Sequence, residues 1–184
     1  MARKQASRYM LLGLLSWRPM SGYDIKKIVE NSIKDFWHES YGNIYPVLQR
    51  FVEDGLAERR VERQEGRPDR IEYTITPRGY EELVAWLERP TEARKSRDVF
   101  LAKFLFGYLQ SKEENIARME EYRRERAERL EWYREMLTTL EKDSRRSRKL
   151  LLEFLALRQG FIITEARVKW CDEVLSALRD FKGE

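Results

Sequence analysis

The chain has 184 residues, a formal net charge of +4 and a charged fraction of 37%. This length allows one large domain or two small ones, and no apolar run approaches the roughly 20 residues that cross a membrane. A single cysteine excludes an intramolecular disulfide, and together with a single histidine it excludes a zinc cluster. We therefore expect a cytoplasmic, helix-rich protein without metal, cofactor or membrane partner. The small positive charge does not locate a nucleic-acid site.

The first half of the chain begins with three predicted helices. Residues 7–17 form a dense apolar helix, and a break at residues 18–20 follows. Ser21 and Asp24 have the spacing of a capping box, which predicts the start of a second helix. The third predicted helix lies in the stretch YGNIYPVLQRFVEDG and ends at Gly55.

Strand signals follow the third helix. Apolar and polar residues alternate over residues 57–63 and again over 71–75, on either side of a Gly- and Pro-containing turn at 65–69. This pattern predicts a β-hairpin. Thr76 and Pro77 then start a fourth helix, which ends at Pro90. Three helices, a hairpin and a helix predict a winged helix-turn-helix domain over residues 1–90.

Beyond Pro90 the strand signals vanish and residues 91–184 read as helical. A helix is expected over residues 94–110, a long one after the capping box at 111–114, and a last one after a polar break at 143–147. Apolar positions of the last helix alternate in steps of four and three, which is typical of a coiled-coil seam that a second copy would bury. We therefore predict a helical dimerisation domain over 91–184, with these seam residues: Leu150, Phe154, Leu157, Phe161, Val168, Cys171, Leu175 and Leu178. The predicted fold class is thus mainly α with a small β-hairpin.

The third helix is amphipathic in an unusual way. Its apolar positions form one face, which leaves another set facing outward: Ser40, Asn43, Tyr45, Pro46, Gln49 and Arg50. Amide side chains pair with adenine edges and arginine pairs with guanine or phosphate, so this face suits the major groove of DNA. The plainer interpretation is that Tyr45 packs between helices while Asn43 caps the helix. The winged-helix frame favours DNA.

The hairpin carries a second basic group. Arg63, Arg67 and Arg70 surround its turn and can reach a minor groove or phosphates, although neighbouring carboxylates offset some of this charge. Lys26 and Lys27 on the second helix are further candidates for backbone contacts, and a solvated helix face explains them almost as well.

Other residues carry weaker signals. A set of aromatic residues is a candidate wall of a small-molecule effector pocket between the domains or at a dimer axis, although core packing explains each one singly: Trp86, Phe100, Phe104, Trp132 and Trp170. We find no phosphate-binding glycine loop and no Ser/His/Asp set, so an enzyme is not expected.

Three stretches together resemble the PadR family of bacterial transcriptional regulators: LLGLLSWRPMSGYDIKKIVE, YGNIYPVLQRFVEDGLAERR and GRPDRIEYTITPRGYEEL. The carboxyl half resembles the virulence-activator type of C-terminal domain through SRDVFLAKFLFGYL. The resemblance implies a homodimeric, sequence-specific binder of double-stranded DNA at an inverted repeat. Such proteins are usually repressors that small, often aromatic, molecules release. It also implies that DNA meets Tyr41, Gly42, Asn43, Tyr45 and Pro46. The alternative is a winged-helix protein-interaction module without specific DNA readout.

Overall fold

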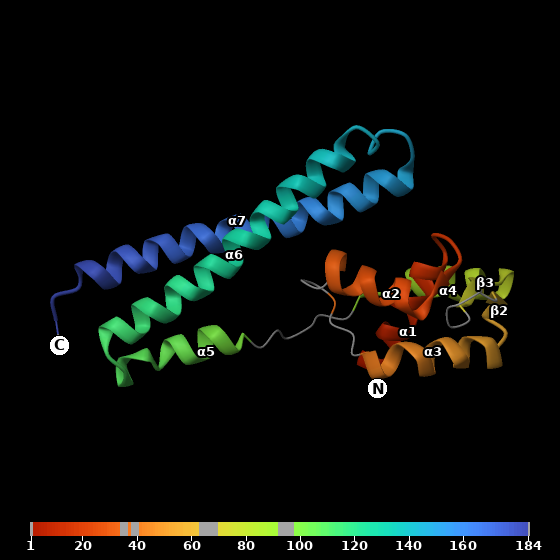
Figure 1. Cartoon of the computed structure of the whole chain (residues 1–184), viewed down its shortest axis with the longest axis horizontal. Coiled ribbons are helices and arrows are strands. Elements are labelled where there is room, and N and C mark those ends of the chain that lie inside the picture. Colours follow the sequence, from red (N-terminus) through yellow and green to blue (C-terminus); the bar gives the residue numbers. More distant parts are fainter. Residues whose placement is uncertain (1, 34–36, 38–40, 63–69, 92–97, 184) are drawn as a thin grey trace. The chain divides into compact units, whose positions relative to one another are not determined.

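The computed structural model describes residues 2–33, 37, 41–62, 70–91 and 98–183 (Figure 1). The chain divides into two compact units, Met1–Ala93 and Arg94–Glu184. The first contains the sheet and the second is helical. Among the described residues, no helix is long and apolar enough to span a membrane.

The first unit surrounds a small sheet with helices. Its elements in chain order are α1 (Ala2–Leu15), β1 (Met20–Ser21), α2 (Gly22–Ile28), a π-helical turn η1 (Val29–Ile33), α3 (Tyr41–Glu53), β2 (Ala57–Glu62), β3 (Arg70–Ile75) and α4 (Pro77–Leu87).

Local capping sets the helix boundaries in this unit. The Ser21 hydroxyl accepts a hydrogen bond from the Asp24 amide at 3.2 Å, and the Asp24 carboxylate accepts one from the Ser21 amide at 2.9 Å, so the predicted capping box is present. The Thr76 hydroxyl caps α4 by accepting a hydrogen bond from the Gly79 amide at 3.1 Å, and Pro77 is the first residue of the helix. Gly55 ends the turn after α3 with φ of 70°, a left-handed conformation that favours glycine.

The sheet has three antiparallel strands in the order β1-β3-β2. The predicted hairpin is confirmed as β2 and β3, with Arg59 opposite Tyr73. The short strand β1 was not predicted, because residues 18–20 indicated only a break between helices. Met20 pairs with Tyr73, and Ser21 pairs with Glu72. This pairing joins the start of α2 to the hairpin.

The core of the first unit lies between the helices and one face of the sheet. Helix α3 contributes Ile44, Leu48 and Phe51, none of which is more than 1% exposed. They pack with buried residues of α1, the η1 turn and the strands, among them Leu11, Leu12, Leu15, Val29 and Ile75. Burying one large apolar side chain stabilises the fold by about 1.5–3 kcal/mol. The three buried side chains therefore fix the orientation of α3 about its own axis.

The second unit contains a helical hairpin and a shorter helix. Its elements are α5 (Val99–Leu105), a 3-10 turn η2 (Gly107–Leu109), α6 (Lys112–Glu141) and α7 (Arg148–Asp180). Figure 1 shows α6 and α7 running side by side in opposite directions. The helix predicted over residues 94–110 is shorter than expected. The side chain of Asn115 donates to the Gly107 carbonyl at 2.8 Å and occupies the space of a side chain there, which favours a glycine turn.

The predicted seam of α7 faces α6 of the same chain over its carboxyl half. Cys171 is fully buried, Leu175 is 5% exposed, and both pack against Met119 of α6. The other predicted seam residues, from Leu150 to Leu178, are half-buried. Since α6 already covers Cys171 and Leu175, these two do not offer a surface to a second copy, and this part of the seam prediction needs correction.

Candidate nucleic-acid interface

The outward face of α3 carries the polar side chains that the sequence singled out. Asn43, Gln49 and Arg50 are exposed, and Tyr45 is 56% exposed. The Gln49 amide donates to the Glu53 carboxylate one turn later at 3.2 Å. The opposite face is buried, so α3 presents this polar face to solvent without any rearrangement of the core.

Proline in α3 exposes a backbone acceptor. Pro46 lies inside the helix and has no amide hydrogen, so the carbonyl of Gly42, four residues earlier, receives no hydrogen bond from it. Both residues are exposed. A Cβ atom at Gly42 would have nothing within 4 Å among the described residues. The first turns of α3 are therefore open to close approach by another molecule.

Tyr45 is oriented by the start of α2. A Cβ atom at Gly22 would lie 2.6 Å from Cε1 of the Tyr45 ring, so the ring packs directly over the glycine backbone. The same ring remains more than half exposed. One side of the Tyr45 ring therefore packs between helices and the other faces solvent, and contact of its exposed side with DNA stays a prediction.

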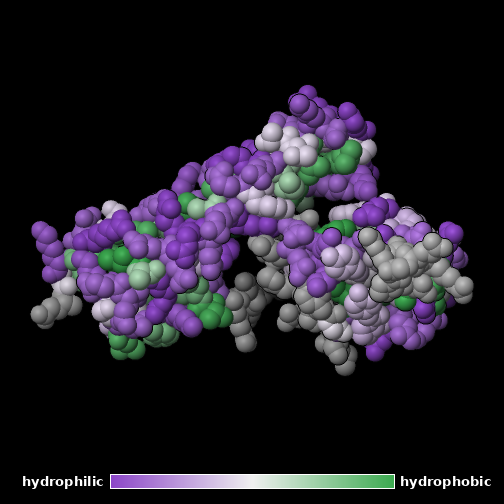
Figure 2. Space-filling view, viewed as in Figure 1, coloured by the Kyte–Doolittle hydropathy of each residue, from purple (hydrophilic) through white to green (hydrophobic). Residues whose placement is uncertain are grey.

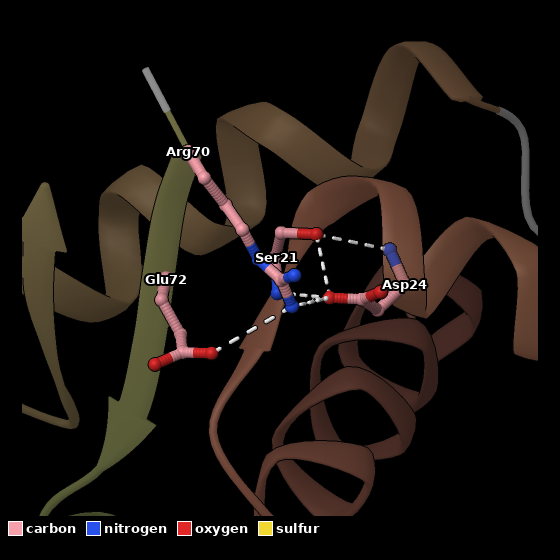
Figure 3. A network of polar contacts seen from close by, with 4 residues as sticks. All are labelled: Ser21, Asp24, Arg70 and Glu72. Carbon is pink, nitrogen blue, oxygen red and sulfur yellow. Dashed lines mark hydrogen bonds and ion pairs between the residues drawn. The ribbon is translucent and has the colours of Figure 1, made fainter. Parts of the chain in front are cut away.

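Arg70 is held by an ion-pair network (Figure 3). Its Nη2 atom lies 2.9 Å from Asp24 Oδ2 and 3.7 Å from Glu72 Oε1. Burial alone would raise the pKa of Asp24. Hydrogen bonds from the Ser21 side chain and backbone, together with the charges of Arg70 and Arg18, outweigh burial and lower that pKa. Arg70, which the sequence predicted to contact a DNA groove, is therefore paired with carboxylates of its own unit.

Of the other predicted basic residues, the structure describes Lys26 and Lys27 on α2. Lys27 is exposed and its Nζ lies 4.7 Å from the centre of the Tyr23 ring, while Lys26 is half-buried. Ser40, Arg63 and Arg67 lie outside the described residues, and Tyr41 is the first residue of α3.

Sequence reasoning passed over two exposed cations on β2, Arg59 and Arg60. They are adjacent in the sequence, so they point to opposite faces of the strand. Arg60 lies opposite Glu72 in the register. Both residues lie on an exposed edge strand, and this would have identified them. The sequence alone does not give the strand order and so does not show that β2 lies at the edge.

Three of the five predicted pocket aromatics meet in the second unit. Phe100 stacks on Tyr122 with ring centres 3.7 Å apart, and the Trp170 ring lies edge-on to Phe104 at 5.8 Å. Trp132 instead packs against Tyr133 with Arg129 over its ring. Trp86 belongs to the first unit, where it stacks on Tyr9.

The second unit also contains a polar groove, which these rings do not line. This groove of about 500 Å³ between α6 and α7 is lined mainly by charged side chains. Arg123 pairs with Asp172 across it, and Arg179 lies 2.6 Å from Glu120. These two ion pairs engage four of the charged side chains, and the carboxylate of Asp180 accepts a hydrogen bond from Ser176 Oγ at 3.4 Å. Among the described residues, no group of three or more metal-ligating side chains is placed to hold a metal.

A row of apolar side chains on α7 faces solvent. Leu155 is 49% exposed and Ile162 is 53% exposed, and the neighbouring Leu151, Leu152 and Ile163 are also exposed. Figure 2 shows a hydrophobic patch near the end of the hairpin where α6 connects to α7, within a mostly hydrophilic surface. Exposed apolar side chains that gather on one side of a helix are candidates for an interaction surface.

Helices α1 to α3 pack with a small sheet, and α3 has a polar outer face. This arrangement defines a winged helix-turn-helix protein. Residues 11–85 match the family described as the transcriptional regulator PadR-like family, and residues 96–179 match the virulence activator alpha C-terminal domain. The chain belongs to the PadR-like family of transcriptional regulators.

Relatives support this membership. The chain is 32% identical to the negative transcriptional regulator PadR of Bacillus subtilis over 108 residues, which are 58% of this chain and 59% of that protein, so the alignment spans less than two thirds of the relative. The structure of that PadR with operator DNA is similar with a TM-score of 0.80 and 25% identity, covering 94% of this chain and 99% of the other. Its complex with p-coumaric acid has a TM-score of 0.68 and 22% identity, covering 97% and 98%. The Vibrio cholerae virulence activator AphA has a TM-score of 0.70 and 30% identity, covering 94% and 97%.

Proposed function

We propose that the protein is a homodimeric repressor that binds an inverted repeat in double-stranded DNA through α3. The observation that carries this proposal is the division of α3 into a buried apolar face and an exposed face with Asn43, Tyr45, Gln49 and Arg50. A structure of the B. subtilis relative contains operator DNA, which supports the same use of the fold here. The role is one of binding, without catalysis, in the cytoplasm where the DNA lies.

The proposed contacts follow from side-chain chemistry. Gly42 and Pro46 leave the first turns of α3 open, so that backbone can approach phosphates. Asn43 and Gln49 suit adenine edges, and Arg50 suits guanine or phosphate. Tyr41, Ser40, Arg63, Arg67, Lys26 and Lys27 remain in the proposed set. Arg70 does not, because Asp24 and Glu72 engage its guanidinium.

The dimer is proposed to form through residues 91–184, with residues 1–90 as the DNA-binding domain. The exposed apolar row of α7 supports this, because a second copy would remove it from water. The half-buried seam residues border that row, and the contact is proposed to include them: Leu150, Phe154, Leu157, Phe161, Val168 and Leu178. Two α3 helices related by a two-fold axis would then enter successive major grooves about one turn apart.

We also propose that a small aromatic molecule releases the protein from its operator. The relative's structure with p-coumaric acid concerns that protein. In this chain, the Phe100 ring stacks on those of Phe104 and Tyr122 and the Trp170 ring lies edge-on to Phe104, which makes an aromatic cluster suited to an aromatic ligand. Titration of protein tryptophan fluorescence with phenolic acids, followed by operator release, tests this part. Unchanged operator affinity at saturating acid contradicts it for that acid.

The test of the main proposal is fluorescence anisotropy on the DNA upstream of the protein's own gene, with a scrambled duplex and a salt series. We expect binding that exceeds the scramble by about a thousandfold or more. Tyr45→Ala and Arg50→Ala should each remove most of this preference. Arg145→Ala is the matched control, because Arg145 is exposed in the turn between α6 and α7 and carries the same charge. Equal, salt-sensitive binding to both duplexes would instead favour a protein-docking face.

A further inference from the structure

The end of the hairpin where Glu62 pairs with Arg70 is tied to the start of α2, 46 residues away in the sequence. Arg70 is the first residue of β3, and Asp24 lies in the first turn of α2. Asp24 Oδ2 accepts three hydrogen bonds, from the Ser21 amide at 2.9 Å, the Ser21 hydroxyl at 2.7 Å and Arg70 Nη2 at 2.9 Å. Figure 3 shows the Arg70 side chain extending from β3 toward this carboxylate.

The same turn of α2 also contacts the outward face of α3. Gly22, next to the capping residue Ser21, lies directly beneath the Tyr45 ring. A continuous set of contacts therefore runs from β3 through Arg70, Asp24 and the α2 start to Tyr45. Every step is a hydrogen bond or a van der Waals contact, without an intervening loop.

The pair is partly withdrawn from solvent. The side chains of Arg70 and Asp24 are 38% and 21% exposed, and the Arg70 Nε atom is buried without a hydrogen-bond partner among the described residues. A partly exposed ion pair contributes little to overall stability. Its stronger effect is on geometry, because a binding surface held in its bound arrangement avoids the cost of ordering it.

We propose that Asp24 and Arg70 are positioning residues that hold the hairpin and the Tyr45 face of α3 in one arrangement for DNA. This proposal rests on the proposed function of α3. A direct DNA contact by Arg70 predicts a different behaviour. Loss of Asp24 would then free the guanidinium and leave binding equal or tighter, whereas a positioning role requires that the same loss weaken binding.

The experiment compares specific operator affinity for Asp24→Asn, Asp24→Glu and Arg70→Gln, with a salt series for each. The asparagine keeps an oxygen for the capping box and removes the ion pair. Asp54→Asn is the matched control, because it breaks the 2.7 Å pair between Asp54 and Arg8 in the same unit and changes the net charge equally. Thermal unfolding of every variant verifies folding.

We expect Asp24→Asn to bind about threefold to tenfold more weakly than Asp54→Asn, and Asp24→Glu to retain affinity. Arg70→Gln should weaken binding with an unchanged salt slope. Equal affinity of the two asparagine variants overturns the positioning role. A slope reduced by about 0.9 in Arg70→Gln, the value of one phosphate contact, also overturns it. If the wild-type chain lacks operator preference, the proposed function fails and the positioning role fails with it, a result that differs from both of these.

Discussion

The ring of Tyr45 lies against Gly22, with Cε1 2.6 Å from the position that a Cβ atom at residue 22 would occupy. We expect Gly22→Ala to displace the ring and to lower specific operator affinity by about tenfold, which is about 1.4 kcal/mol. Anisotropy titration measures this loss. Affinity equal to that of the wild type would show that the position of the Tyr45 ring is irrelevant to DNA binding.

Gly13→Ala is the control for that variant. Gly13 lies inside α1, and an added Cβ would meet only Leu83 at 3.9 Å, an ordinary contact. Alanine is the better helix former by about 0.5–1 kcal/mol, so this variant should be equally stable or more stable with unchanged DNA affinity. Chemical denaturation measures the stability, and a drop below the wild type would contradict the packing described around α1.

Asp24 should make the stability of the fold decrease at low pH. Its folded-state pKa is lower than the unfolded value, so its contribution is fully present above the ordinary carboxyl pKa and is lost as pH falls through the folded pKa. We expect the free energy of unfolding of the wild type to exceed that of Asp24→Asn by up to about 1 kcal/mol at pH 7 and by less at pH 3. Urea unfolding at both values measures the difference, and a constant difference contradicts it.

Cys171 should be unreactive in the folded chain. Burial raises the pKa of its thiol, and the neighbouring carboxylate of Asp172 raises it further. The residue is 0% exposed between α6 and α7. We expect labelling by Ellman's reagent at neutral pH to be slow in buffer and fast in denaturant. Rapid labelling of the native protein would show that the α6–α7 helical hairpin opens around Cys171.

Self-association should depend on the exposed row of α7. Leu155→Glu or Ile162→Glu places a charge in the proposed contact while leaving the buried side of α7 unchanged, since both residues are about half exposed. Sedimentation velocity should show dissociation to monomers. Thr138→Glu, an exposed change on α6 with the same added charge, should remain dimeric. Dimers that survive both α7 variants would place the interface elsewhere.

Local sequence signals predicted much of this fold. The capping boxes at Ser21 and Ser111, the Thr76 cap and the hairpin depend on residues within a few positions of one another, so their patterns appear directly in the sequence. The face of α3 was predictable for the same reason, because Ile44 and Leu48 recur with the helical period.

Contacts between distant residues were not predictable. The Arg70–Asp24 pair spans 46 residues, and nothing local distinguishes Arg70 from a cation directed at DNA. Strand β1 has two residues and depends on β3 for its partner. The seam of α7 showed which side is apolar but not which helix covers it, so Cys171 was assigned to a second copy when α6 of its own chain covers it.

Binding by two α3 helices of a dimer can be tested on the operator itself. Footprinting on the DNA upstream of the protein's own gene locates the two half-sites, and affinity is then compared after about five base pairs, half a helical turn, are inserted between them. We expect that the two α3 helices can then no longer reach both half-sites, so specific binding falls to the level of a single half-site. Unchanged affinity would contradict a dimer that reads an inverted repeat.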